Sequence, residues 1–140
     1  MAYREKLAAV GFASMALVYG VYFTLVATRP PVPHLIDMLW LFGIAAPIHA
    51  LLYALGMFAI RLPNWKEGAA PPDERDRAIA RRGRSIAYLV LLAGTILVGV
   101  VMPFSEAPGK IVNAALFAIV AAELVNDGVV LISYRRGWHG

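Results

Sequence analysis

Cysteine is absent from the 140-residue sequence, and charged residues are scarce. Without cysteine the chain cannot be a disulfide-stapled scaffold, and it has no thiol nucleophile. Charged residues make up 16% of the sequence, against about 25% in a typical soluble domain, and 60% of the residues are hydrophobic. Lysine and arginine are missing altogether from four long apolar blocks. Together these deficits exclude a soluble globule and a disordered tail, and they predict an integral membrane protein.

The motifs of common enzyme classes are missing as well. The sequence has no Cys/His metal spacing, no glycine-rich phosphate loop and no Ser-His-Asp set, and too few acidic residues and histidines for a two-metal site. A b-type haem commonly needs two intramembrane histidines, but only His49 lies inside an apolar block, whereas His34 and His139 lie outside. We therefore expect a protein that is not an enzyme and carries no cofactor or metal. A redox subunit is the less favoured option.

Four apolar blocks are long enough to cross a bilayer, because about 20 helical residues span a hydrocarbon core of about 30 Å. They cover residues 7–28, 38–60, 85–105 and 111–133. None shows the alternation of a membrane β-strand. The first block starts like a signal peptide, yet it is too long and lacks a small-x-small cleavage site, so we expect a retained span. The sequence predicts an all-α membrane protein, one domain of four transmembrane helices in an up-down-up-down bundle.

Basic residues are distributed unequally among the connections. Eleven lie before the first block, between the second and third, or after the fourth, whereas only Arg29 and Lys110 lie in the two remaining connections. Cytoplasmic connections of inner-membrane proteins are enriched in lysine and arginine. This distribution predicts a multi-pass protein of a cell inner membrane, with both termini and the middle connection in the cytoplasm.

The middle connection contains a charged segment, residues 73–84. Asp73 follows two prolines and is a predicted N-cap, with Glu74 and Asp76 in the first turn, where acidic groups complement the positive helix end. We expect one helix from Asp73 to about Met102, so that the segment projects into the cytoplasm. Its last bases are Arg77, Arg81, Arg82 and Arg84. We expect them to contact anionic lipid headgroups, at about 1 kcal/mol per base, and we expect no nucleic-acid binding so close to the membrane.

Two motifs in the second half of the chain resemble a known family. They are Asp73-Glu74-Arg75-Asp76-Arg77, followed by Ile79, Gly83, Tyr88 and Leu89, and the terminal Tyr134-Arg135-Arg136-Gly137. This pattern is similar to a family of small bacterial predicted membrane proteins of unknown function. The resemblance covers residues 73–137, while the first half is similar only in having two spans. It implies a small membrane protein with no assigned activity, of a kind that often looks like an accessory protein beside a transcriptional regulator.

Four polar residues inside the apolar blocks are candidates for function, because an ionisable group there normally faces the bundle interior with a partner. They are His49 in the second block and Glu123, Asn126 and Asp127 in the fourth. Counted from the outer ends of their helices, His49 and Glu123 both lie roughly 18–20 Å deep. Tyr53 and Asp127 each follow one turn later. If the second and fourth helices touch, we expect two pairs, His49 with Glu123 and Tyr53 with Asp127.

The two carboxyls lie four residues apart on one helix and repel each other when both are ionised. We expect at least one to stay protonated near neutral pH and to exchange protons with His49. The predicted function is therefore binding or passage of a proton, a cation or a small cationic compound. Structural roles remain open, with His49 as a hydrogen-bonded core residue and the acids as interhelical hydrogen-bond partners. A further interpretation of Asp127 is that it forms an ion pair with Arg81 or Arg84.

The alternative function is that of an accessory or regulatory protein that docks a cytosolic or membrane partner through residues 73–84.

Small residues at four-residue spacing, such as Ala118 with Ala122 and Ala16 with Gly20, let membrane helices approach closely. They predict packing within one bundle, with a homodimer face as the alternative. The expected partners are thus anionic lipids, a second copy of the chain and a partner protein.

Overall fold

The computed structural model describes residues 2–29 and 35–138, so His34 and His139 lie outside the described residues. Its helices are α1 (Tyr3–Thr28), α2 (Leu35–Arg61), α3 (Trp65–Ala69), α4 (Glu74–Ile96) and α5 (Pro108–Arg135), with a π-helical turn η1 (Leu97–Val101) and a 3-10 turn η2 (Met102–Phe104) that extend α4. Four of these helices, counting α4 with its extension as one, are long and apolar enough to cross a membrane, and the described part contains no strand. The predicted all-α fold of four spans is confirmed.

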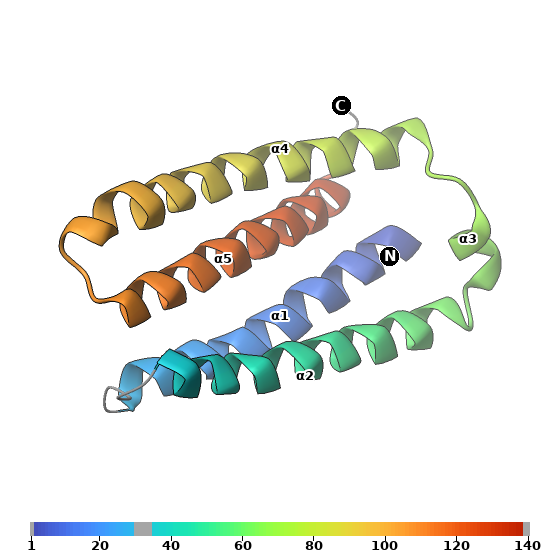
Figure 1. Ribbon diagram of the computed structural model, residues 1–140. Coiled ribbons are helices and arrows are strands. Elements are labelled where there is room, and N and C mark those ends of the chain that lie inside the picture. The colour runs from blue at the N-terminus through green and yellow to red at the C-terminus, as the bar shows by residue number, and fades with distance from the viewer. Residues whose placement is uncertain (1, 30–34, 139–140) are drawn as a thin grey trace.

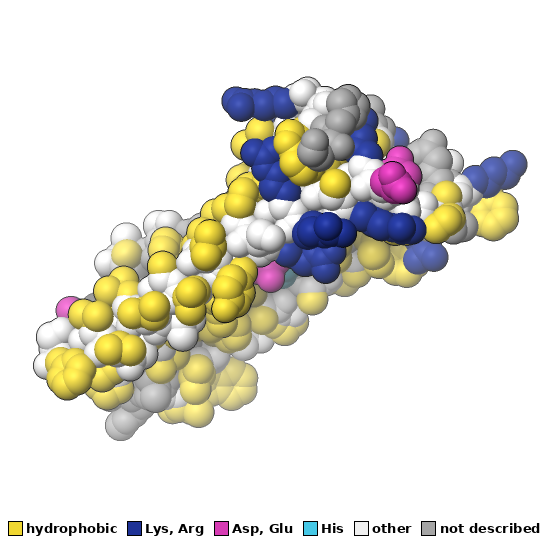
Figure 2. All heavy atoms as spheres, turned by 90° about the horizontal axis from the view of Figure 1, so that it is seen from above, with side chains coloured by type: hydrophobic (Ala, Val, Ile, Leu, Met, Phe, Trp, Pro, Cys, Tyr) yellow, Lys and Arg dark blue, Asp and Glu magenta, His cyan; other side chains and the backbone are white. Residues whose placement is uncertain are grey.

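The four long helices form two antiparallel hairpins, α1 with α2 and α4 with α5 (Figure 1). The hairpins meet through α1 and α5, which are therefore the inner helices, while α2 and α4 are the outer ones. The connection through α3 crosses one end of the bundle, where α1 begins and α5 ends. We call this end the basic end, because Figure 2 shows most Lys and Arg side chains gathered there and apolar side chains over the rest of that face.

Helix α4 begins at the predicted cap. The Asp73 carboxylate accepts a hydrogen bond from the Asp76 backbone N–H at 2.6 Å, and the Asp76 carboxylate accepts one from the Asp73 N–H at 3.4 Å. With its extension the helix runs to Phe104, over 31 residues. At about 1.5 Å per residue this length is about 46 Å, against about 30 Å for a hydrocarbon core. About three turns therefore project beyond the apolar layer.

Pro103 accounts for the irregular end of this long helix. Proline has no N–H to donate, and its ring collides with the carbonyl of the residue four positions earlier, here Gly99. The chain widens into the π-helical turn before Pro103 and continues as the 3-10 turn. This irregular stretch avoids the collision between the Pro103 ring and the Gly99 carbonyl, so the span continues past Pro103. Pro47, by contrast, lies inside α2 without ending that helix.

The main core cluster lies in the half of the bundle away from the basic end, where α1, α2 and α5 meet. Ile79 of α4, nearer the basic end, is also fully buried. Tyr19 and Tyr22 of α1 pack in the main cluster with Val18, Ala45 and Val120. Tyr22 is 2% exposed, and its hydroxyl donates a hydrogen bond to Asn113 Oδ1 at 2.7 Å. Many large apolar side chains of α2 and α4 are exposed, as expected for outer helices that face lipid.

Replacing Tyr22 with phenylalanine tests the link between α1 and α5. The ring stays in the core and only the hydroxyl is lost, so we expect the free energy of unfolding to fall by about 1 kcal/mol, the usual net contribution of one hydrogen bond. Unfolding in mixed micelles, followed by circular dichroism, measures the change. The matched control is Tyr88→Phe, because Tyr88 is 63% exposed. Equal stability of the two variants would contradict the role of the Tyr22 hydroxyl.

Candidate functional site: a polar cluster inside the bundle

His49 lies on α2 among aromatic side chains. The centroid of its ring is 5.4 Å from that of Tyr19 on α1 and 6.4 Å from that of Tyr53, one turn along α2. Its Nε2 atom is buried and has no hydrogen-bond partner within the described residues. Leaving a buried polar atom unpaired costs about 1–3 kcal/mol, and such an atom calls for an explanation. A water molecule or a small ligand that forms a hydrogen bond with Nε2 would satisfy it.

Tyr53 and Asp127 approach each other at Gly11 of α1. A methyl group added to Gly11 would collide with Asp127 Oδ2 and would lie 3.6 Å from Tyr53 Cε2. Gly11 is buried, and its lack of a side chain is what lets α2 and α5 bring these two groups to the same point. The structure therefore brings Tyr53 and Asp127 to the same side of α1, as expected from their depth, although no hydrogen bond joins the two.

Asn126 connects this group to α4. Its Nδ2 donates a hydrogen bond to Asp127 Oδ1 at 3.2 Å. A methyl group added to Gly83 of α4 would lie 2.9 Å from Asn126 Oδ1, so the amide packs directly against the α4 backbone. His49, Tyr53, Asp127 and Asn126 thus follow one another from α2, past α1, to the contact between α5 and α4, with Tyr53 at the edge of the group and 37% exposed. We call these four residues the polar cluster.

The predicted contact between His49 and Glu123 is wrong. Glu123 is exposed, and His49 Nε2 has no hydrogen-bond partner within the described residues. Equal depth does not fix the face of a helix that a residue occupies. Asp127 lies about 40° further round α5 than Glu123, at 3.6 residues per turn, and reaches α1. The expected contact between the second and fourth helices is also slight, because α1 packs against both α2 and α5.

Other expectations have mixed outcomes. Among the described side chains, Asp127 forms no ion pair with Arg81 or Arg84. The described part of the chain also contains no group of three or more His, Asp or Glu side chains that could hold a metal ion. Ala118 packs closely against Gly94 of α4, so it serves packing within the chain. The small residues Ala16 and Gly20 are exposed on α1, and a homodimer face there stays a prediction.

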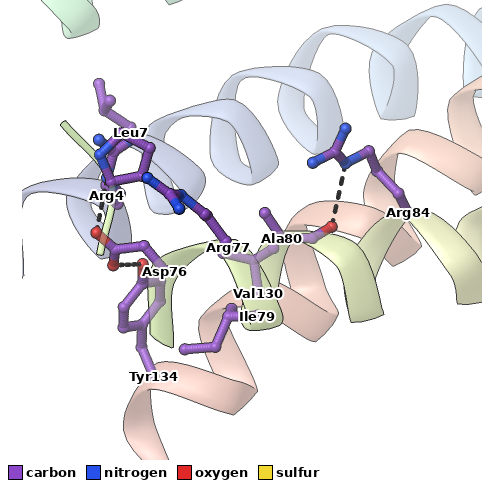
Figure 3. Close-up of a pocket in the computed structure, with 10 residues that line it drawn as sticks. Arg4, Leu7, Asp76, Arg77, Ile79, Ala80, Arg84, Val130 and Tyr134 are labelled. Carbon is purple, nitrogen blue, oxygen red and sulfur yellow. Dashed lines mark hydrogen bonds and ion pairs between the residues drawn. The ribbon is translucent and has the colours of Figure 1, made fainter. Parts of the chain in front are cut away.

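A second group of polar contacts ties the helices together at the basic end, and sequence reasoning missed it. Asp76 Oδ2 accepts a hydrogen bond from Arg4 Nε at 2.9 Å, and Asp76 Oδ1 accepts one from the Tyr134 hydroxyl (Figure 3). The carboxylate therefore joins α1, α4 and α5. Both motifs that carry the family resemblance contribute, Asp76 from the first and Tyr134 from the second, but nothing in the sequence indicates that they meet.

The four predicted lipid-contacting arginines fall into two groups. Arg77 and Arg84 line a pocket of about 300 Å³ between α1, α4 and α5. Arg82 instead lies over the Trp138 ring, 4.8 Å from its centroid, and Arg81 lines a second, separate pocket that it shares with Arg84. All four arginines are exposed. Because Asp73 and Asp76 are engaged within the chain, mainly bases of the segment 73–84 remain for a partner protein. Docking through this segment stays a prediction.

These features define a class of protein, a small multi-pass helical bundle whose four long helices can span a membrane and hold polar side chains between them. Comparisons with protein-family models, with curated proteins and with solved structures found no match to this chain.

Proposed function

We propose that this chain is a non-enzymatic protein of a bacterial inner membrane that binds and passes protons or small cations at the polar cluster. The observation that carries the proposal is the buried Nε2 atom of His49, which has no hydrogen-bond partner in the described structure. Ionisable groups inside membrane helices are costly to insert, and they commonly mark ion pathways. The proposed orientation places the basic end in the cytoplasm.

The polar cluster contains the groups that a proton relay needs. A neutral imidazole can accept a proton at one nitrogen, and a carboxylate can accept one at either oxygen. Tyr53 stands between them, with its ring beside His49 and one edge near Gly11, where Asp127 also lies. In the proposed exchange one proton leaves the imidazolium of His49 and binds the carboxylate of Asp127, so the total charge is unchanged. A small cation would compete with that proton for the carboxylate.

Glu123 provides a control that distinguishes proton passage through the polar cluster from an effect that any acidic residue in the membrane would have. It lies on the same helix as Asp127, four residues earlier, but it is exposed and outside the polar cluster. An exchange that uses the cluster depends on Asp127 and not on Glu123. The chain therefore offers two carboxyls one helical turn apart on α5, of which Glu123 is exposed and Asp127 is partly buried.

Reconstitution of the full chain into vesicles that contain a pH-sensitive dye tests the proposal. We expect wild-type protein to dissipate an imposed pH gradient faster than empty vesicles do. Asp127→Asn should abolish this excess rate, because the amide cannot take up a proton, and His49→Phe should reduce it. Glu123→Gln is the matched control: it removes a neighbouring charge but leaves the Asp127 carboxyl in place, so proton passage above the empty-vesicle rate should persist. Normal dissipation by Asp127→Asn, or its loss only in Glu123→Gln, would count against the polar cluster as the pathway.

A further inference from the structure

The pocket at the basic end combines arginines with an apolar floor (Figure 3). Its lining includes Arg4 and Leu7 of α1, Arg77 and Arg84 of α4, and Val130 and Tyr134 of α5. Three arginines face one carboxylate there, that of Asp76, so the lining carries a net positive charge. The pocket is thus a concave site with a cationic rim, formed where three helices meet.

Two of the three guanidinium groups are free of acidic partners. Arg4 is held by Asp76 at 2.9 Å, but Arg77 and Arg84 form no ion pair with any side chain that the structure describes. Arg84 donates only its Nε–H to a carbonyl of its own helix, that of Ala80 at 3.3 Å. Both side chains extend from α4 on the side that faces α1 (Figure 3). Their remaining N–H donors are available to an anion.

The depth of the pocket matches the headgroup layer of a bilayer. About 20 residues of helix span the hydrocarbon core, and counting back from Phe104 places Arg84 at the inner edge of that core. Arg77 lies seven residues further out, or about 10 Å. Tyr134, at the end of α5, is the kind of residue that is enriched at membrane interfaces. A phosphate between these arginines would lie where lipid phosphates lie.

We propose that this pocket binds one anionic glycerophospholipid. Its phosphodiester lies between Arg77 and Arg84, since guanidinium groups offer paired N–H donors that suit phosphate oxygens. The glycerol and the upper part of an acyl chain contact the apolar floor, which includes Leu7 and Val130. Basic pockets between membrane helices are a recognised form of lipid site. The proposal goes beyond diffuse attraction to the membrane surface, because it assigns binding to Arg77 and Arg84 and not to Arg81 and Arg82.

Native mass spectrometry of the full chain in detergent, titrated with phosphatidylglycerol, tests the site. We expect one tightly bound lipid per chain in wild-type protein and at least about tenfold weaker binding in the double variant Arg77→Gln/Arg84→Gln. The matched control Arg81→Gln/Arg82→Gln removes the same charge from the same helix and should bind as wild type does. If the first double variant does not fold, the single variants Arg77→Gln and Arg84→Gln replace it, with Arg81→Gln as the control.

Three other outcomes would overturn the proposal. Equally weakened lipid binding in both double variants would show that binding depends on diffuse surface charge and not on the pocket. Equal binding of phosphatidylcholine, whose headgroup has no net charge, would remove the preference for an anionic lipid. Displacement of the lipid by inorganic phosphate at similar concentration would assign the site to a free phosphate instead. None of these readouts depends on proton passage, so they test the lipid site independently of the polar cluster.

Discussion

Replacing Gly83 with leucine should separate α4 from α5 and lower the free energy of unfolding by about 3 kcal/mol, the upper part of the usual range for overpacking. Gly83 is buried between the two helices. A methyl group at this position would lie 2.9 Å from Asn126 Oδ1, 3.0 Å from Val130 Cγ2 and 3.1 Å from the Asn126 carbonyl oxygen. The amide and the valine could rotate away, but the carbonyl belongs to the α5 backbone and cannot move without the helix.

The matched control is Gly20→Leu. Gly20 lies on α1 with nothing within 4 Å of an added methyl group, so leucine there faces open space. Leucine also favours helix over glycine by roughly 1 kcal/mol or slightly less, so this variant should be as stable as wild type or more stable. Unfolding in mixed micelles measures both variants. A Gly83→Leu protein as stable as Gly20→Leu would contradict the close packing of α4 on α5.

Asp76→Ala should lower the free energy of unfolding by about 2 kcal/mol, within the range for hydrogen bonds to charged groups. The substitution removes the acceptor for Arg4 and for the Tyr134 hydroxyl, and it also removes half of the capping box with Asp73. The ion pair is partly exposed, with the Arg4 side chain at 36% and the Asp76 side chain at 21% of full exposure, which limits the loss. The effect should be largest at low salt.

Glu74→Ala is the control for Asp76. Both acids lie in the first turn of α4, so both complement the helix dipole, but Glu74 is exposed and joins no other helix. Hydrogen exchange at the start of α1 gives a second readout, because loss of the Asp76 contacts should speed exchange there and loss of Glu74 should not. Equal effects of the two substitutions would show that only the helix end, and not the junction of three helices, depends on Asp76.

The polar cluster shows which part of a membrane site a sequence can predict. Depth follows from counting residues along a helix, and it correctly placed Tyr53 and Asp127 near the same level. The angular position around the bundle does not follow from counting, since it depends on which helices are neighbours. Glu123 was therefore expected against His49 on the basis of depth alone, whereas the structure leaves it exposed. Gly11, which admits both Tyr53 and Asp127, carried no signal in the sequence.

The sequence by itself determined the four helices and the start of α4 at Asp73, because these depend on properties that act locally: an apolar length that matches a bilayer, and a side chain that caps its own helix. The tertiary structure alone decided that α1 and α5 are the inner helices, that Asp76 joins three helices, and that three arginines line one pocket. These features bring together residues far apart in the chain. In lipid, where apolar surfaces have little reason to prefer one another, the choice of neighbours depends on small residues and polar groups such as Gly11, Gly94 and Asp127.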